Sequence, residues 1–199
     1  MDGVMLIIDP QKAFGVDGAP VQVPGVEAAL ANMGKAARAW NIQWKHFKGV
    51  VITTRHFYDH SHEVGNVSHF IPQIGDIMAE HSPWSAFHDC EFDFNKSDIV
   101  LKKTEFNAFS GTKLDRILCR LQRPTLVIAG LTTPICIEST VRSAHQRGFN
   151  TIVLSDACAS QAMGNETAEQ AHQSAIGRMG YVFSQIMTTD EFIENIKLR

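Results

Sequence analysis

The chain has 199 residues, of which 44% are hydrophobic and 20% are charged, and its formal net charge is −3. These values suit one globular domain over residues 1–199, and a weakly acidic chain without runs of Lys or Arg is not expected to bind nucleic acid. No apolar stretch reaches the length of about 18 residues that a transmembrane helix needs, and the first residues lack a signal-peptide pattern, so we expect no membrane partner.

Apolar β-branched runs predict strands, and apolar residues at helical spacing predict helices. In the first half we expect strands at 4–8, 50–54 and 99–101 and helices at 26–45 and 114–121. In the second half we expect strands at 125–129, 151–154 and 181–183 and helices at 134–148, 166–178 and 189–198. This alternation predicts an α/β fold with three α-β-α layers and a doubly wound, mainly parallel sheet of about six strands in the order 3-2-1-4-5-6.

A long interval between the second and third predicted strands interrupts the alternation. Residues 55–98 hold six histidines, with Pro72, Pro83 and Trp84, and show little periodicity. A loop of this length within a compact domain usually serves a function. We therefore expect a lid or a pocket wall from this interval.

The most informative residue is Cys136, which follows the predicted strand at 125–129. Thr133 can cap the next helix, Pro134 suits its first position and Gly148 suits its end. Cys136 then lies in the first helical turn, where the helix dipole and the amide N–H groups favour a reactive thiolate. The alternative is an inert buried cysteine, because cysteine often packs as a small hydrophobe. The four cysteines have no CxxC spacing, which indicates reduced thiols and a cytoplasmic location.

Two other polar residues follow predicted strands. Asp9 follows the first strand and Lys103 the third, as Cys136 follows the fourth. The carboxyl ends of parallel strands form one edge of the sheet, where ligands bind. A carboxylate that accepts the thiol proton and an ammonium that stabilises the thiolate would make Cys136 a nucleophile.

Ordered motifs around these residues resemble those of the isochorismatase-like cysteine hydrolases, which include nicotinamidases and N-carbamoylsarcosine amidase. The matching residues in chain order are Asp9, Gln11 and Phe14; Lys103, Ala108, Phe109, Gly111, Thr112 and Leu114; Gly130, Thr133, Cys136 and Ile137; Ala144, Gly148 and Phe149; and Val153, Leu154, Asp156 and Ala157. The resemblance covers most of the chain, and residues 55–98 match least.

The resemblance implies a role for each residue of the site. Cys136 would be the nucleophile, Asp9 the base that later acts as an acid, and Lys103 the electrostatic partner. A cis peptide at Leu131-Thr132 would turn the amides of Thr132 and Cys136 into an oxyanion hole. The implied activity is hydrolysis of a small-molecule amide through a thioester, and the implied assembly is a homodimer or homotetramer.

The pocket and a possible metal are the least constrained features. Side chains expected to contact the substrate are Phe14, His56, Trp84 and Phe109. Nicotinamidases bind a divalent metal through an Asp-x-His pair and further histidines; His56 and His62 are candidates here, but Thr54 occupies the Asp position, so we expect no cofactor. Two alternatives stay open: a metal-assisted, nicotinamidase-like hydrolase, and a catalytically silent binding or scaffold member of the family.

Overall fold

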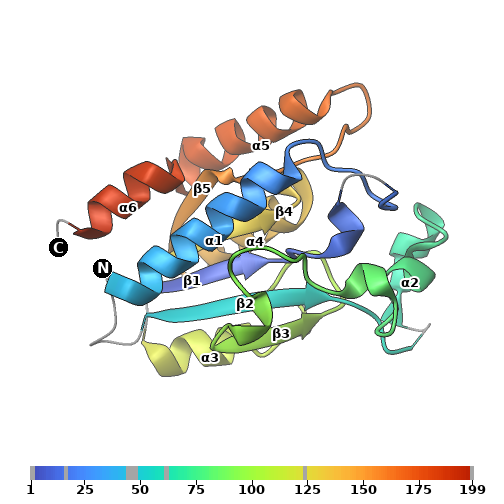
Figure 1. The fold of residues 1–199 in the computed structure, drawn as a ribbon, viewed down its shortest axis with the longest axis horizontal. Helices are drawn as coiled ribbons and strands as arrows, with labels where there is room; N and C mark the ends of the chain where they lie inside the picture. Colours follow the sequence, from blue (N-terminus) through green and yellow to red (C-terminus); the bar gives the residue numbers. More distant parts are fainter. Residues whose placement is uncertain (1–2, 16–17, 44–48, 61–62, 123–124, 198–199) are drawn as a thin grey trace.

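A computed structural model describes residues 3–15, 18–43, 49–60, 63–122 and 125–197, and its centre is a parallel six-stranded sheet (Figure 1). The strands are β1 (Gly3–Ile8), β2 (Val50–His56), β3 (Ile99–Lys103), β4 (Thr125–Leu131), β5 (Asn150–Ala159) and β6 (Gln185–Met187). Their order is β3-β2-β1-β4-β5-β6, and every pairing is parallel. The predicted doubly wound α/β fold is therefore confirmed, and its switch point lies between β1 and β4.

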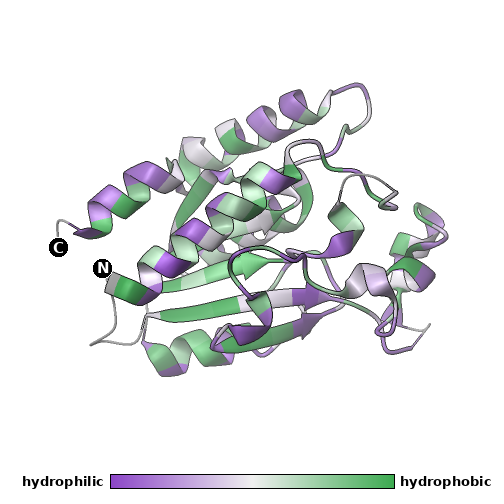
Figure 2. Cartoon of the chain, viewed as in Figure 1, coloured by the Kyte–Doolittle hydropathy of each residue, from purple (hydrophilic) through white to green (hydrophobic). Residues whose placement is uncertain are grey.

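Helices cover both faces of the sheet. On one face, α1 (Val26–Gln43) and α6 (Thr189–Lys197) bury Trp40 and Phe192 with the odd-numbered residues of β1. On the other face, α3 (Leu114–Leu121), α4 (Glu138–Gln146) and α5 (Ala168–Val182) pack on its even-numbered residues. Figure 2 shows strands that are hydrophobic along most of their length and helices with mixed polarity, as burial of a sheet on both faces requires.

The central strands approach closely where they end. Ile8 of β1 pairs with Gly130 of β4, whose φ is +134°. A Cβ atom at position 130 would lie 2.1 Å from the carbonyl oxygen of Ile8, so only glycine fits here. This contact brings the residues that follow β1 and β4 to the same point on the sheet edge.

The predicted strand at 181–183 is wrong. Tyr181 and Val182 belong to the last turn of α5, with 87% and 54% of their surface exposed, and the strand that pairs with β5 is β6. Helix α5 starts at a capping box formed by Thr167 and Gln170, and its buried positions continue at helical spacing to Met179. A three-residue apolar run does not distinguish a strand from the end of a helix.

In the described part of the interval after β2, the helical segments are short and include η3 (Gly65–His69), α2 (Ile74–Ile77), η4 (Pro83–Ser85) and η5 (Phe94–Lys96). Hydrogen bonds of the Gln11 side chain connect this region to the edge of the sheet. Its side-chain Nε2 donates to the carbonyl oxygens of His56 and Ser85, each at 2.8 Å, and its Oε1 accepts from the His56 amide at 2.7 Å. Within the described ranges, none of the helices combines the length and the apolar character needed to cross a membrane.

Candidate active site

Asp9 occupies the first position after β1 in an unusual backbone conformation. Its φ is +49°, in the left-handed region that aspartate tolerates better than most residues. The Thr54 hydroxyl accepts a hydrogen bond from the Asp9 amide at 3.2 Å and donates one to the Asp9 carboxylate at 2.6 Å. Both contacts come from one side chain of the neighbouring strand, so Thr54 fixes the backbone and the carboxylate of Asp9 together.

Lys103 ends β3, and its side chain is fully buried. Its Nζ lies 2.7 Å from Oδ2 of Asp9 and 3.7 Å from Sγ of Cys136. It also donates to the carbonyl oxygens of Glu105 and Phe106 at 2.9 and 3.3 Å. The structure thus brings together the three residues that the sequence places after separate strands.

The contact between Lys103 and Cys136 spans three strand spacings, because β2 and β1 lie between β3 and β4. At ~4.8 Å for each spacing, the two strands are about 14 Å apart. The long lysine side chain covers part of this gap. The chain beyond β4 covers the rest, since Cys136 lies five residues after Leu131, the last residue of the strand.

Cys136 lies in a π-helical turn, η6 (Thr133–Ile137), which leads directly into α4. The predicted cap is wrong: Thr132 is the residue before the turn, and the Thr133 hydroxyl instead contacts Nδ1 of His172 at 2.8 Å. The peptide bond between Leu131 and Thr132 is cis, as the resemblance implies. Gly148 ends the helical segment as predicted, with a φ of +80° two residues after α4.

The surroundings of Cys136 favour a thiol in the resting protein. Burial raises the pKa of Cys136 to about 12; the charge of Lys103 opposes this shift, and Asp9 adds to it through its charge and a hydrogen bond. Burial would lower the pKa of Lys103, but the charges of Asp9 and Cys136 outweigh it and raise this pKa. Burial therefore opposes the thiolate that the helix dipole was expected to favour, and a nucleophilic role for Cys136 would require a nearby base.

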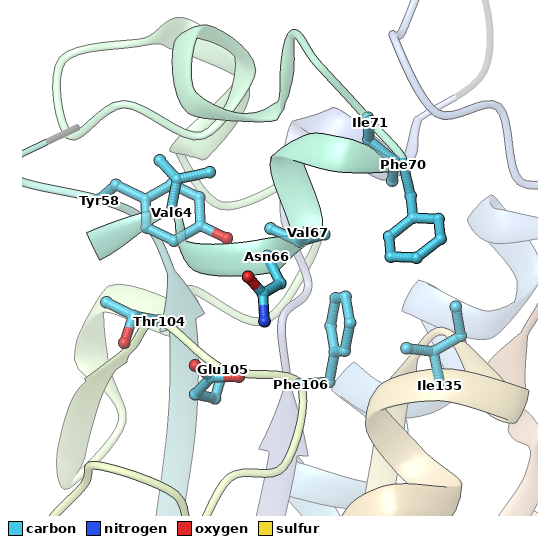
Figure 3. A pocket seen from close by; sticks show the side chains of 10 residues that line it. All are labelled: Tyr58, Val64, Asn66, Val67, Phe70, Ile71, Thr104, Glu105, Phe106 and Ile135. Carbon is cyan, nitrogen blue, oxygen red and sulfur yellow. The ribbon is translucent and has the colours of Figure 1, made fainter. Parts of the chain in front are cut away.

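A cavity of about 460 Å³ is lined in part by Thr104 and Ile135, the sequence neighbours of Lys103 and Cys136 (Figure 3). One wall comes from the predicted interval, with Tyr58, Val64, Asn66, Val67, Phe70 and Ile71. The opposite wall comes from the segment after β3 and from η6, with Thr104, Glu105, Phe106 and Ile135. Lys103 donates to two carbonyl groups of this wall, and Ile135 precedes Cys136, so the wall of the cavity is bonded to the buried cluster.

The side chains expected to contact the substrate are not among the lining residues of this cavity. Phe14 and Trp84 pack against the small apolar cluster of Ala13, Tyr58, Ile74 and Met78, which shares Tyr58 with the cavity wall. Phe109 is 5% exposed and stacks on Phe149 in the core under α3 and α4. Sequence spacing could not reveal this, because an aromatic residue near a catalytic motif suits either a core or a pocket.

His56 is buried behind Lys103. Its Nδ1 is 3.3 Å from Nζ of Lys103, and its Nε2 is 2.9 Å from the Tyr58 hydroxyl. Burial, and then the charge of Lys103, lower the pKa of His56 well below 6.5, so the ring is neutral.

A metal does not fit at His56, because both ring nitrogens already have protein partners. The second candidate, His62, lies outside the described residues. Among the residues that the structure describes, no group of three or more His, Cys, Asp or Glu side chains is arranged to hold a metal ion.

Sequence reasoning missed Tyr58, Asn66 and Glu105 as parts of the cavity, and it considered Thr54 only as a missing metal ligand. The position of Glu105 could have been predicted from the sequence, because it lies two residues after Lys103 and therefore near the same edge of the sheet. Tyr58 and Asn66 had none, since the path of the chain through the long interval determines where they lie.

Comparisons with known proteins agree with this geometry. Residues 4–191 match the model of the isochorismatase domain. One relative is the isochorismatase family protein YrdC of Bacillus subtilis, which is 28% identical over 96% of this chain and 94% of its own length. Another is the maleamate amidohydrolase of Pseudomonas putida, which is 32% identical over 75% of this chain and 68% of its own length. A ureidoacrylate amidohydrolase, RutB of Methylorubrum extorquens, is 25% identical over 77% of this chain and 68% of its own.

Solved structures match the fold over nearly the whole chain. A cysteine hydrolase from Pseudomonas syringae pv. phaseolicola superimposes with a TM-score of 0.88 at 23% identity, covering 99% of this chain and 93% of its own. The family model spans all six strands as far as the start of α6. The chain therefore belongs to the isochorismatase family.

Proposed function

We propose that this hydrolase cleaves the C–N bond of a small amide through a thioester on Cys136. The observation that carries the proposal is the fully buried contact of one lysine with both Asp9 and Cys136 beside a cavity. The names of the maleamate and ureidoacrylate amidohydrolases among the relatives support an amide substrate.

In the first half of the proposed reaction, Asp9 takes the Cys136 proton as Sγ attacks the amide carbonyl carbon. Lys103 stabilises the sulfur anion, and its charge compensates for the low polarity of the site. The amides of Thr132 and Cys136 are the proposed donors to the oxyanion. Protonated Asp9 then gives its proton to the leaving nitrogen, the C–N bond breaks, and ammonia or an amine departs.

In the second half, Asp9 takes a proton from water, and the hydroxide oxygen attacks the thioester carbonyl. The C–S bond breaks, and the sulfur recovers the proton from Asp9. The net reaction converts an amide and water into a carboxylic acid and ammonia or an amine. Asp9 and Cys136 return to their starting protonation states, so no other reactant is needed.

The test is ammonia release from primary amides, ureido compounds and carbamoyl compounds, maleamate included, by wild-type protein and by Cys136→Ala. We expect Cys136→Ala to lose all detectable turnover, while Cys119→Ala, which removes an exposed cysteine on α3, keeps wild-type activity. Mass spectrometry after rapid acid quench should find the acyl group of the substrate on the peptide that contains Cys136. Full activity of Cys136→Ala would eliminate covalent catalysis at this residue.

A further inference from the structure

The cavity beside Cys136 has an uneven chemical character. Six of its ten lining residues are apolar: Val64, Val67, Phe70, Ile71, Phe106 and Ile135. The others are Tyr58, Asn66, Thr104 and Glu105, and no Lys, Arg or His occurs among the described residues that line it. Among the described lining residues, Glu105 therefore provides the only formal charge. Figure 3 shows the Asn66 side chain extending from the η3 turn toward the segment with Glu105 and Phe106.

The Glu105 carboxylate is available to a ligand. Its residue is exposed, and within the described ranges its side chain forms no ion pair. Its backbone is nevertheless fixed relative to the reacting groups, because its carbonyl oxygen accepts from Lys103 at 2.9 Å. The backbone of residue 105 is thus anchored to Lys103, and the Glu105 side chain lines the cavity.

The nearest lysines do not supply a compensating charge to a ligand. Lys102 forms ion pairs with Asp59 and Glu63. Lys103 is buried against Asp9. The pKa of the Tyr58 phenol is raised to about 12, first by burial and then by the charge of Glu105. The phenol therefore stays protonated and can donate a hydrogen bond.

From this cavity we infer that the substrate is an amide with an apolar body and a positively charged amino group at the end away from the scissile bond, which Glu105 binds. This inference rests on the proposed amide hydrolysis and adds the substrate class. The apolar walls contact the body of the substrate, and the Glu105 carboxylate pairs with the ammonium group. A substrate with a carboxylate at the same end would meet the like charge of Glu105 and no described basic side chain, so it is disfavoured.

The experiment compares three amides of matched length: δ-aminovaleramide, hexanamide and the monoamide of adipic acid. They end in an ammonium group, a methyl group and a carboxylate. We expect kcat/KM to fall in that order, with about a tenfold difference between the first and the last, because the attraction of the ammonium and the repulsion of the carboxylate by Glu105 add at low salt. Most of the difference should be in KM, because Glu105 contacts a part of the substrate that does not react.

Two variants test the residue itself. Glu105→Gln should reduce the preference for δ-aminovaleramide over the adipic monoamide to about twofold, and Glu105→Lys should reverse it. Glu194→Gln removes an exposed carboxylate from α6, on the far side of α1 from this cavity, and should leave the preference unchanged. Equal turnover of the three amides, or a preference that stays near tenfold in Glu105→Gln, would overturn the inference.

Binding measurements separate this inference from the proposed function. Calorimetry with Cys136→Ala should show tighter binding of δ-aminovaleramide than of the adipic monoamide, and the Glu105→Gln substitution should reduce the difference to about twofold. If this result is obtained but no amide is cleaved by the wild type, the inference stands and the proposed hydrolysis fails. If amides are cleaved through Cys136 without a charge preference, the hydrolysis stands and the inference fails. No binding of δ-aminovaleramide and no cleavage of any tested amide would contradict both.

Discussion

The segment from Cys136 to Glu138 takes part in two charged clusters, which differ in how completely positive and negative charges compensate each other. Glu138, at the start of α4, pairs with Arg142 at 2.7 Å and with Arg178 at 2.8 Å. Both arginines remain about half exposed, at 42% and 48%. Burial would raise the pKa of Glu138, but the hydrogen bonds and charges of the two arginines lower it. This carboxylate is a stable anion that joins α4 to α5.

The cluster of Asp9, Lys103 and Cys136 is fully buried and has two acidic groups for one cation. Lys103 can balance only one negative charge, so the proposed reaction needs Asp9 to accept the Cys136 proton when the sulfur becomes an anion. The comparison shows that charge pairing alone does not indicate a reactive site. We expect a reactive cluster where two buried acidic groups have only one cation between them, because the two groups then share one proton.

The largest expected effect comes from Asp9→Asn. Asparagine tolerates the left-handed backbone but cannot accept the thiol proton, so turnover should fall by roughly 10²–10⁴-fold. Asp9 contributes to the raised pKa of Cys136, so its removal should lower this pKa and speed alkylation by iodoacetamide at neutral pH. Activity and alkylation would then change in opposite directions. A slower alkylation in Asp9→Asn would contradict the proposed proton sharing.

The second prediction compares the stability of the two clusters. Lys103→Met leaves Asp9 buried without its cation, and we expect a loss of about 3–5 kcal/mol in the free energy of unfolding. Glu138→Gln acts on a cluster with solvent-exposed arginines and should lose only about 1 kcal/mol and keep wild-type turnover. Urea unfolding measures both variants. The double variant Asp9→Asn/Lys103→Met should be more stable than Lys103→Met alone; equal stability would mean that the buried charge is not the cause.

The smallest expected effect is on stability in mild acid. Burial and the charge of Lys103 keep His56 neutral in the folded protein, while the unfolded chain takes up a proton below about pH 6.5. The contribution of His56 is therefore present above pH 6.5 and is lost as the pH falls toward the folded pKa. As the pH is lowered from about 7.5 to about 5.5, the melting temperature of the wild type should decrease. The decrease should be smaller for His56→Gln. Burial also lowers the pKa values of His88 and His172. We expect these two residues to cause the decrease in melting temperature that remains in His56→Gln.

Much of the fold could be predicted from local patterns. Strands β1, β2 and β4 are buried on both faces and have continuous apolar runs, so their positions were predictable within a few residues. The end of α5 was not, because the apolar run at 181–183 suits a strand and a helix equally. The short helical segments of the long interval were also not predictable, since they depend on contacts such as those of Gln11 with His56 and Ser85.

By itself, the sequence determined the parallel α/β fold and the three polar residues at the carboxyl edge, because strand periodicity and the position just after a strand are local properties. It also marked Cys136 as the nucleophile candidate through its motif. Only the tertiary structure decided that Cys136 is a buried thiol, that Thr54 fixes Asp9, and that Glu105 faces the cavity. Each of these depends on distances between segments far apart in the chain, and burial and charge compensation arise only when those segments pack together.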